Sequence, residues 1–239
     1  YELVIPKKIY QTWKTQNLPQ KIMKLHRNFR SLNTQYDHIL YTDEQMNDYM
    51  SSNADKELAD IYWKMNHIVA RADIWRYTIL YNEGGIYVDI DSLITGSLDE
   101  LINIEDKAII TAETNQGLYA QWALIFEKKH IILENTLNNI LRDIHQEKHR
   151  FDHHSLTVVN YANAISKVTK DAGQDLNWEN IHKNTDMTIG TDSFTFRVFG
   201  VDYNEYFQFK HKYNHLLRGR PKGIEIDTHW SLQEQKPLY

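Results

Sequence analysis

The 239-residue sequence predicts a single α/β domain over residues 1–239, because segments with helical spacing alternate with short apolar runs that suit buried strands. No repeat, low-complexity tract or linker divides the chain, and its length suits one large domain. Hydrophobic residues make up 41% and charged residues 25% of the chain, as in ordinary globular proteins. The 15 Tyr and 6 Trp either fill a core or stack on a planar, polar ligand.

The first third of the chain predicts strands and helices in turn. Apolar residues recur at helical spacing after Pro19, a residue type that suits the first helical turn. Thr42 and Gln45 stand at the spacing of a capping box, which predicts the start of another helix. The predicted elements are a strand and loop at residues 4–13, a helix at 18–32, a strand at 36–41, and helices reaching residue 49 and covering 56–64.

The central segment predicts a longer helix followed by a strand. Apolar residues recur at helical period over residues 68–81, at Ile68, Ala72, Trp75 and Ile79. The glycine pair after Glu83 ends this helix, because glycine best tolerates the left-handed conformation that follows a helix. The run IYVDID at residues 86–91 is rich in strand formers and ends in acid.

The second half predicts the remaining elements of the sheet and its helices. These are strands at residues 107–112, 123–126 and 195–199 and helices at residues 131–144 and 157–168. From residue 203 onward the chain is polar and aromatic and predicts no definite element.

Charge and composition limit the possible partners. The formal net charge of −5 disfavours nucleic acid, because binding to a phosphate backbone needs a basic surface, although a local basic patch could hold one diphosphate. The absence of cysteine excludes disulfides and thiolate catalysis, and suits a reducing compartment, so we favour the cytoplasm. No run of about 18 apolar residues spans a membrane, while the start at Tyr1 leaves open a lost anchor or targeting segment.

Two carboxylates, Asp89 and Asp91, form a candidate metal site. Side chains alternate along a strand, so both acids can point the same way while Ile90 points to the core. Two carboxylate charges roughly 4–5 Å apart repel by about 3–4 kcal/mol at an effective dielectric constant near 20. A Mg²⁺ or Mn²⁺ ion removes this repulsion and can bridge to a diphosphate. The alternative is a solvated pair at the junction of strand and loop.

Asp73 and Arg76 lie three residues apart and therefore on one face of the predicted helix. A hydrogen-bond acceptor and a donor placed in this way can hold the hydroxyls of a sugar. The alternative is an ordinary surface ion pair, which contributes well under about 1 kcal/mol.

The segments ADIWRY (residues 72–77) and LYNEGGIYVDID (residues 80–91) resemble the DXD-containing sugar-binding region of glycosyltransferase family 32. The same block is similar to the catalytic domain of the large clostridial glucosylating toxins. Residues 5–13 look like the opening strand of the family, with Tyr10 where His is common, and residues 228–231 look like its closing His-Trp segment. The resemblance implies the GT-A fold, a Rossmann-like mixed sheet flanked by helices, with the DXD acids at a strand end beside the nucleotide.

Carried over to this chain, the resemblance implies a role for each matching residue. A catalytic set comprises Asp73, Arg76 and Asp91, in which Asp73 and Arg76 hold the donor sugar. A metal set comprises Asp89, Asp91 and His229, in which Asp91 binds the metal directly and Asp89 also contacts the ribose. The donor-binding residues are Trp13, Asp73, Arg76, Tyr87, Asp89 and Trp230. Trp13 would stack on the base and Trp230 would shield His229, although Trp13 and Trp230 could be packing residues and His229 a surface histidine.

Two segments depart from the family pattern. The family often has Gly-Pro followed by Thr in its second half, whereas this chain has His153-His154-Ser155-Leu156-Thr157 there. This departure leaves the wall of the donor pocket, and with it the donor sugar, open. Residues 218–223 (RGRPKG) predict either a solvated loop or a mobile lid over the diphosphate.

The implied activity is a glycosyltransferase that uses Mn²⁺ or Mg²⁺ and a nucleoside-diphosphate sugar, with a UDP-sugar favoured. The sugar would pass to a hydroxyl of a glycan or protein acceptor, with retention of configuration by family analogy. One alternative is a non-catalytic nucleotide-sugar-binding protein on the same scaffold. Another is a phosphatase of the haloacid-dehalogenase type, which Leu93 disfavours because Thr or Val is usual two residues after the second Asp.

Overall fold

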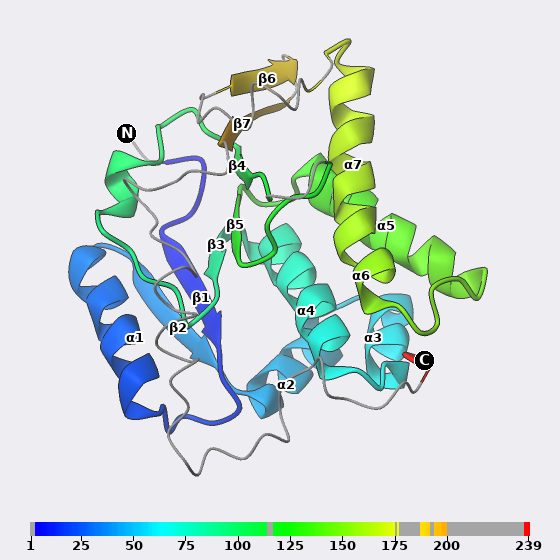
Figure 1. The fold of residues 1–239 in the computed structure, drawn as a ribbon, viewed down its shortest axis with the longest axis horizontal. Coiled ribbons are helices and arrows are strands. Elements are labelled where there is room, and N and C mark those ends of the chain that lie inside the picture. The colour runs from blue at the N-terminus through cyan, green and yellow to red at the C-terminus, as the bar shows by residue number, and fades with distance from the viewer. Residues whose placement is uncertain (1–2, 114–116, 175, 177–186, 192–193, 200–236) are drawn as a thin grey trace.

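The computed structural model describes residues 3–113, 117–174, 176, 187–191, 194–199 and 237–239. Within them, a mixed sheet has the strand order β2-β1-β3-β5-β4-β7-β6. The strands are β1 (Lys8–Thr12), β2 (Asp37–Tyr41), β3 (Gly85–Val88), β4 (Ala108–Thr111), β5 (Ala123–Phe126), β6 (Met187–Thr191) and β7 (Phe194–Phe199). Helices flank this sheet (Figure 1), which confirms the predicted α/β class.

The helices follow the predicted order. They are α1 (Gln20–Leu32), α2 (Asp43–Asn53), α3 (Lys56–Lys64), α4 (Ile68–Glu83), α5 (Ile131–His145), α6 (His153–Leu156) and α7 (Val158–Asp171), with a short 3-10 turn, η1 (Leu98–Glu100). The predicted capping box is present: the Thr42 hydroxyl accepts from the Gln45 backbone, and the Gln45 side chain accepts from the Thr42 backbone. No described helix has both the length and the apolar character needed to cross a membrane.

The sheet separates two hydrophobic cores, as alternation of side chains along its strands requires. On one face, Tyr10 and Tyr87 pack with residues from helices α2 to α7. On the other, Ile9 and Ile86 pack with Phe29 of α1 and with residues near η1. Figure 1 shows α1 on one side of the sheet and α4, α5 and α7 together on the other.

Strand β1 is the point at which the strand order reverses. It pairs in parallel with β2 on one side and with β3 on the other. The carboxyl ends of β1 and β3 therefore meet at the same edge of the sheet. In open α/β sheets the crevice at such a reversal is the usual position of a ligand.

Helix α4 leads into β3 through the predicted glycine pair. Gly84 has a φ of 66° and Gly85 a φ of 114°, values that side-chain-bearing residues rarely adopt. The backbones also approach closely here, since a Cβ on Gly85 would lie 2.7 Å from the carbonyl oxygen of Lys8. Glycine at this turn thus allows β3 to pair directly beside β1.

Strand β3 is shorter than the sequence predicts. It ends at Val88, and Asp89, Ile90 and Asp91 form a turn closed by a 3.0 Å hydrogen bond from the Ser92 backbone N–H to the Asp89 carbonyl. The prediction that both acids lie on the strand is therefore wrong, because aspartate favours such turns. Ile90 is still buried, as expected, at 5% exposure.

Candidate functional site

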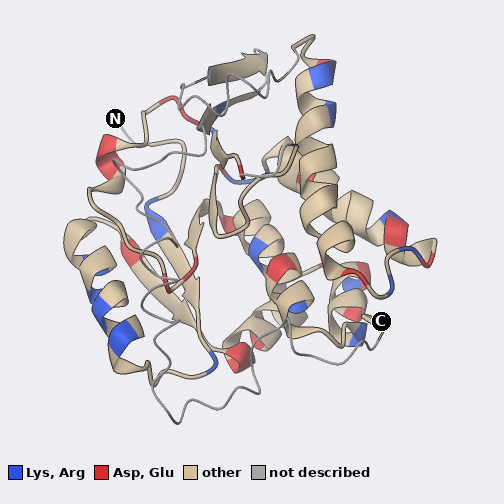
Figure 2. Cartoon of the chain, in the orientation of Figure 1, with Lys and Arg blue, Asp and Glu red and all other residues tan. Residues whose placement is uncertain are grey.

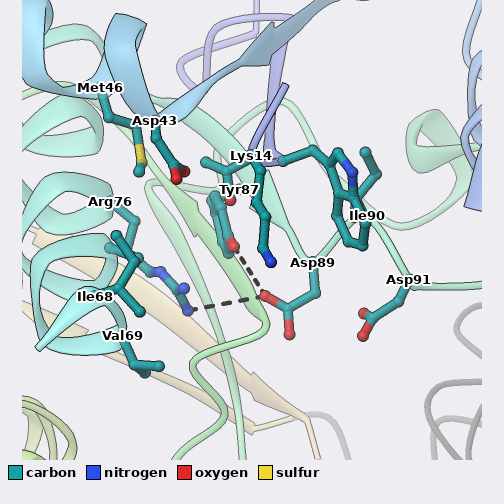
Figure 3. Close-up of a pocket in the computed structure, with 13 residues that line it drawn as sticks. Lys14, Asp43, Met46, Ile68, Val69, Arg76, Tyr87, Asp89, Ile90 and Asp91 are labelled. Atoms are coloured by element: carbon teal, nitrogen blue, oxygen red, sulfur yellow. Dashed lines mark hydrogen bonds and ion pairs between the residues drawn. The ribbon is translucent and has the colours of Figure 1, made fainter. Parts of the chain in front are cut away.

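A pocket of about 250 Å³ opens at the carboxyl ends of β1 and β3, beside the first turns of α2 and α4 (Figure 3). Its lining mixes aromatic, aliphatic and charged side chains, as small-molecule sites do. The lining residues are Thr12, Trp13, Lys14, Asp43, Met46, Ile68, Val69, Ala72, Arg76, Tyr87, Asp89, Ile90 and Asp91. Five predicted site residues meet here: Trp13, Arg76, Tyr87, Asp89 and Asp91.

Arg76 lines one side of the pocket and is held by several contacts. Its Nη1 donates to the Gln121 carbonyl at 2.7 Å and lies 3.9 Å from Asp89 Oδ1. The guanidinium carbon lies 4.2 Å from the centroid of the Tyr87 ring, a cation–π contact. Burial by itself would lower the pKa of Arg76. The nearby Tyr87, Asp73 and Asp89 raise this pKa by more, so the net shift is upward and Arg76 stays protonated. Figure 2 shows acidic and basic residues side by side on α4, the helix that carries Asp73 and Arg76.

Asp73 lies behind Arg76 and is only 3% exposed. Its Oδ1 is 3.4 Å from Arg76 Nη1, and its Oδ2 accepts a 2.7 Å hydrogen bond from the Thr157 hydroxyl. Asp73 is not among the residues that line the described pocket. In this geometry Asp73 positions Arg76, and its predicted contact with the donor sugar stays a prediction.

Tyr87 and Asp89 couple the end of β3 to the turn that follows. The Tyr87 hydroxyl donates to Asp89 Oδ1 at 2.8 Å. Burial raises the pKa of Tyr87 well above its usual value, so the phenol keeps the proton that it donates. The side chain of Asp89 is 23% exposed, and its carboxylate is thus oriented by Tyr87 and Arg76 while it still reaches the pocket.

The two carboxylates of the turn suit a hard divalent cation. Figure 3 shows Asp89 and Asp91 pointing to the same side of the turn. Carboxylate oxygens are the donors that Mg²⁺ and Mn²⁺ prefer, and Mg²⁺ sites combine one or two carboxylates with phosphate oxygens and water. Among the described residues, no three His, Asp or Glu side chains are placed so that they could hold a metal ion by themselves. The residues present therefore fit a metal shared with a phosphate ligand.

The predicted residues of the C-terminal segment cannot be placed. His229, Trp230 and residues 218–223 lie outside the described residues. Their assigned roles in metal binding, shielding and closure stay predictions.

Residues 153–157, which depart from the family pattern, lie behind the pocket. They form α6 and lead into α7, and Thr157 at this junction reaches Asp73. The His153 ring stacks on that of His67 at 4.8 Å between centroids, so α6 lies against the start of α4. Thr157 of this segment thus helps to hold Asp73 in place, and Asp73 in turn contacts Arg76.

Lys14 and Asp43 line the pocket but were not predicted as site residues. Lys14 follows Trp13, and Asp43 is the first residue of α2. Burial raises the pKa of Asp43, and the nearby Lys14 charge opposes this shift. Because Lys14 directly follows Trp13, it could have been predicted as a pocket residue from the sequence. Asp43 could not, because its approach to the pocket depends on the pairing of β1 with β2.

An open mixed sheet with a strand-order reversal, a pocket at that reversal and two acids in the turn after a central strand define the class of this domain as the GT-A fold. Comparison with known proteins agrees with this class. Residues 19–108 match the family model described as "Glycosyltransferase sugar-binding region containing DXD motif". The resemblance inferred from the sequence is thereby confirmed over residues 19–108.

Individual proteins extend the comparison. Inositol phosphoceramide mannosyltransferase 3 of Schizosaccharomyces pombe is 33% identical over 138 residues, which are 58% of this chain and 38% of that protein. The solved PaToxG glycosyltransferase superposes with a TM-score of 0.58 at 19% identity, over 68% of this chain and 69% of that one. The catalytic domain of Clostridium novyi alpha-toxin gives a TM-score of 0.48 at 9% identity, covering 72% and 65%. The chain spans less than half the length of the curated relative.

Proposed function

We propose that this domain is a metal-dependent glycosyltransferase that binds a nucleoside-diphosphate sugar in the pocket beside β1 and β3. The observation that carries the proposal is the placement of the Asp89 and Asp91 carboxylates on one side of a turn, in a pocket that the cation Arg76 also lines. An acidic pair beside a buried guanidinium suits a ligand that contains a cation and a diphosphate.

Each described site residue then has a physical task. Asp89 and Asp91 would hold Mn²⁺ or Mg²⁺, with His229 as a further ligand. When bound, the metal supplies a positive charge that stabilises the diphosphate leaving group. Tyr87 and Arg76 keep Asp89 oriented, so little reorganisation is needed when the donor binds.

The remaining residues would position the donor. Trp13 lines the pocket and would stack on the base, and Trp230 would cover the metal side. Arg76, positioned by Asp73, would face the sugar and the diphosphate. Positioning of this kind accounts for a large part of the rate in bimolecular transfers.

The finer features of the reaction extend this proposal. We favour a UDP-sugar donor, a hydroxyl acceptor on a glycan or glycoprotein, and transfer with retention. The relative from Schizosaccharomyces pombe is named as an inositol phosphoceramide mannosyltransferase, which adds a mannose donor and an inositol phosphoceramide acceptor to the substrates worth testing. A cytoplasmic location stays a prediction.

The direct test is release of nucleoside diphosphate from a panel of UDP- and GDP-sugars with and without Mn²⁺. We expect turnover that depends on the metal, and we expect Asp91→Asn to abolish it while the melting temperature stays within a few degrees of wild type. Asp60→Asn, an exposed aspartate on α3, is the matched control and should turn over normally.

Two outcomes would contradict the proposal. Full metal-dependent turnover by Asp91→Asn would remove the metal role from this turn. A wild-type protein that binds the nucleotide sugar but releases no nucleoside diphosphate would instead be a non-catalytic binding protein on the same fold.

A further inference from the structure

The two cations that line the pocket differ in how many contacts they make with other protein groups. The lining contains three carboxylates, Asp43, Asp89 and Asp91, and two cations, Lys14 and Arg76. Arg76 is 8% exposed and already contacts Asp73, Asp89 and a backbone carbonyl. Lys14 is exposed and, within the described part of the chain, forms no salt bridge. Lys14 is therefore the pocket cation that is available to a ligand.

The backbone fixes where Lys14 enters the pocket. Strand β1 ends at Thr12, and the backbone N–H of Trp13 still donates to the Tyr41 carbonyl at 3.1 Å. Lys14 is the first residue beyond this anchored position. Figure 3 shows its side chain pointing into the pocket, towards the end at which Asp89 lies.

Within the described residues, neither Asp43 nor Asp89 forms a salt bridge with Lys14. Asp43 is the carboxylate whose pKa responds to the Lys14 charge, but burial still raises the pKa of Asp43, so the two groups are not a tight ion pair. An exposed ammonium on a flexible chain needs little desolvation to meet an incoming phosphate. Lysine binds phosphate as a mobile point charge, whereas a buried arginine is held in one geometry.

The charge balance of the loaded site leaves a task for such a cation. The carboxylates of Asp89 and Asp91 carry two negative charges, which one divalent ion offsets. The charge of the bound diphosphate is then met on the protein side by Arg76, whose charge is already shared with Asp73 and Asp89. A further cation within reach of the diphosphate would make up the difference.

We infer that Lys14 binds a diphosphate oxygen of the donor and stabilises the charge that grows there during transfer. In that step the bond from the anomeric carbon to the diphosphate oxygen breaks, and its electron pair stays on the diphosphate. The acceptor oxygen forms the new bond to carbon, and its proton is lost to solvent. Lys14 remains an ammonium throughout. The inference rests on the proposed function, since it concerns a diphosphate in the same pocket.

The test compares ligands that have and lack phosphate. Binding of UDP, GDP, uridine and guanosine is measured by calorimetry with Mn²⁺ for wild type, Lys14→Met, Lys14→Arg and Lys24→Met. Lys24 is an exposed lysine on α1 outside the pocket and serves as the matched control. Methionine keeps most of the length of the side chain and removes its charge.

We expect Lys14→Met to weaken binding of the preferred nucleoside diphosphate about 10–100-fold, the range for a lost hydrogen bond to a charged group. Binding of the corresponding nucleoside should not change, Lys14→Arg should recover most of the lost affinity, and Lys24→Met should match wild type. Raising the salt concentration should weaken binding to wild type more than to Lys14→Met.

Unchanged diphosphate binding by Lys14→Met would overturn the inference and leave the proposed function intact. An equal loss for nucleoside and nucleoside diphosphate would also overturn it, because Lys14 would then act on the base or on the shape of the pocket. A wild-type protein that binds no nucleoside diphosphate would overturn the proposed function and this inference together.

Discussion

The hydroxyl of Thr157 donates to Asp73 Oδ2 at 2.7 Å, across 84 residues of sequence. Asp73 in turn lies 3.4 Å from Arg76, which lies 3.9 Å from Asp89. A continuous set of polar contacts therefore runs from the α6–α7 junction, through the interior, to the turn that carries the candidate metal ligands. The position of Arg76 in the pocket lining therefore depends on contacts with residues that do not line the pocket.

Removing the Thr157 hydroxyl should destabilise the protein. Thr157→Val keeps the shape of the side chain but leaves a buried carboxylate oxygen without this donor, and we expect the free energy of unfolding to fall by about 1–3 kcal/mol. Thr157→Ser retains the hydroxyl and should lose less than half as much. Urea denaturation measures both variants. Equal stability of Thr157→Val and wild type would show that the bond contributes nothing.

The turn between α4 and β3 makes a second prediction. Alanine at Gly85 must adopt a φ of 114° and places its Cβ 2.7 Å from the Lys8 carbonyl oxygen and 3.2 Å from the Tyr10 ring. Gly117 has a φ of 81°, and a Cβ added there would meet nothing within 4 Å, so Gly117→Ala isolates the cost of backbone strain, about 1 kcal/mol. Gly85→Ala should lose clearly more stability than Gly117→Ala in thermal unfolding. Similar losses of stability in Gly85→Ala and Gly117→Ala would mean that β1 can shift away from the added Cβ at little cost.

The third prediction concerns acid stability. His130 is 1% exposed, and its Nδ1 caps α5 by accepting from the Ile132 backbone N–H at 3.2 Å. Burial lowers the pKa of His130 to about 4, from about 6.5 in the unfolded chain. The unfolded state therefore binds the proton more readily, and stability is lost as the pH falls from 6.5 towards 4, by about 3 kcal/mol for this group.

A variant can assign this pH dependence to His130. Asparagine caps helices well and does not titrate. His130→Asn should flatten the fall in unfolding free energy between pH 6.5 and 4.5, as followed by urea denaturation across that range. A wild-type slope in His130→Asn would place the titrating group elsewhere.

Local sequence patterns predicted most of the elements that build the site. The helical period before Gly84, the glycine pair and the strand formers after it determine α4 and β3, because each depends on neighbouring residues. The family resemblance added the fold, which the comparisons confirm. The end of β3 was misplaced because strand propensity does not reveal where a turn hydrogen bond replaces the ladder.

The features that the sequence did not reveal depend on residues far apart in the chain. The bond from Thr157 to Asp73 needs α6 to lie against α4, and α6 itself is too short to give a periodic signal. Asp43 reaches the pocket only because β2 pairs beside β1 and carries α2 there. Strand β6 was also not predicted, because its sequence has little strand signal of its own and it forms a strand by pairing with β7.

Every residue of α4 from Asp73 to Leu80 is buried. Backbone amides in such a buried helix are expected to exchange with deuterium slowly, so we expect the helix that carries Arg76 to be among the slowest-exchanging described segments. Substitutions at the more exposed lining residues Trp13, Lys14 and Asp43 would then change ligand recognition without disturbing the interior.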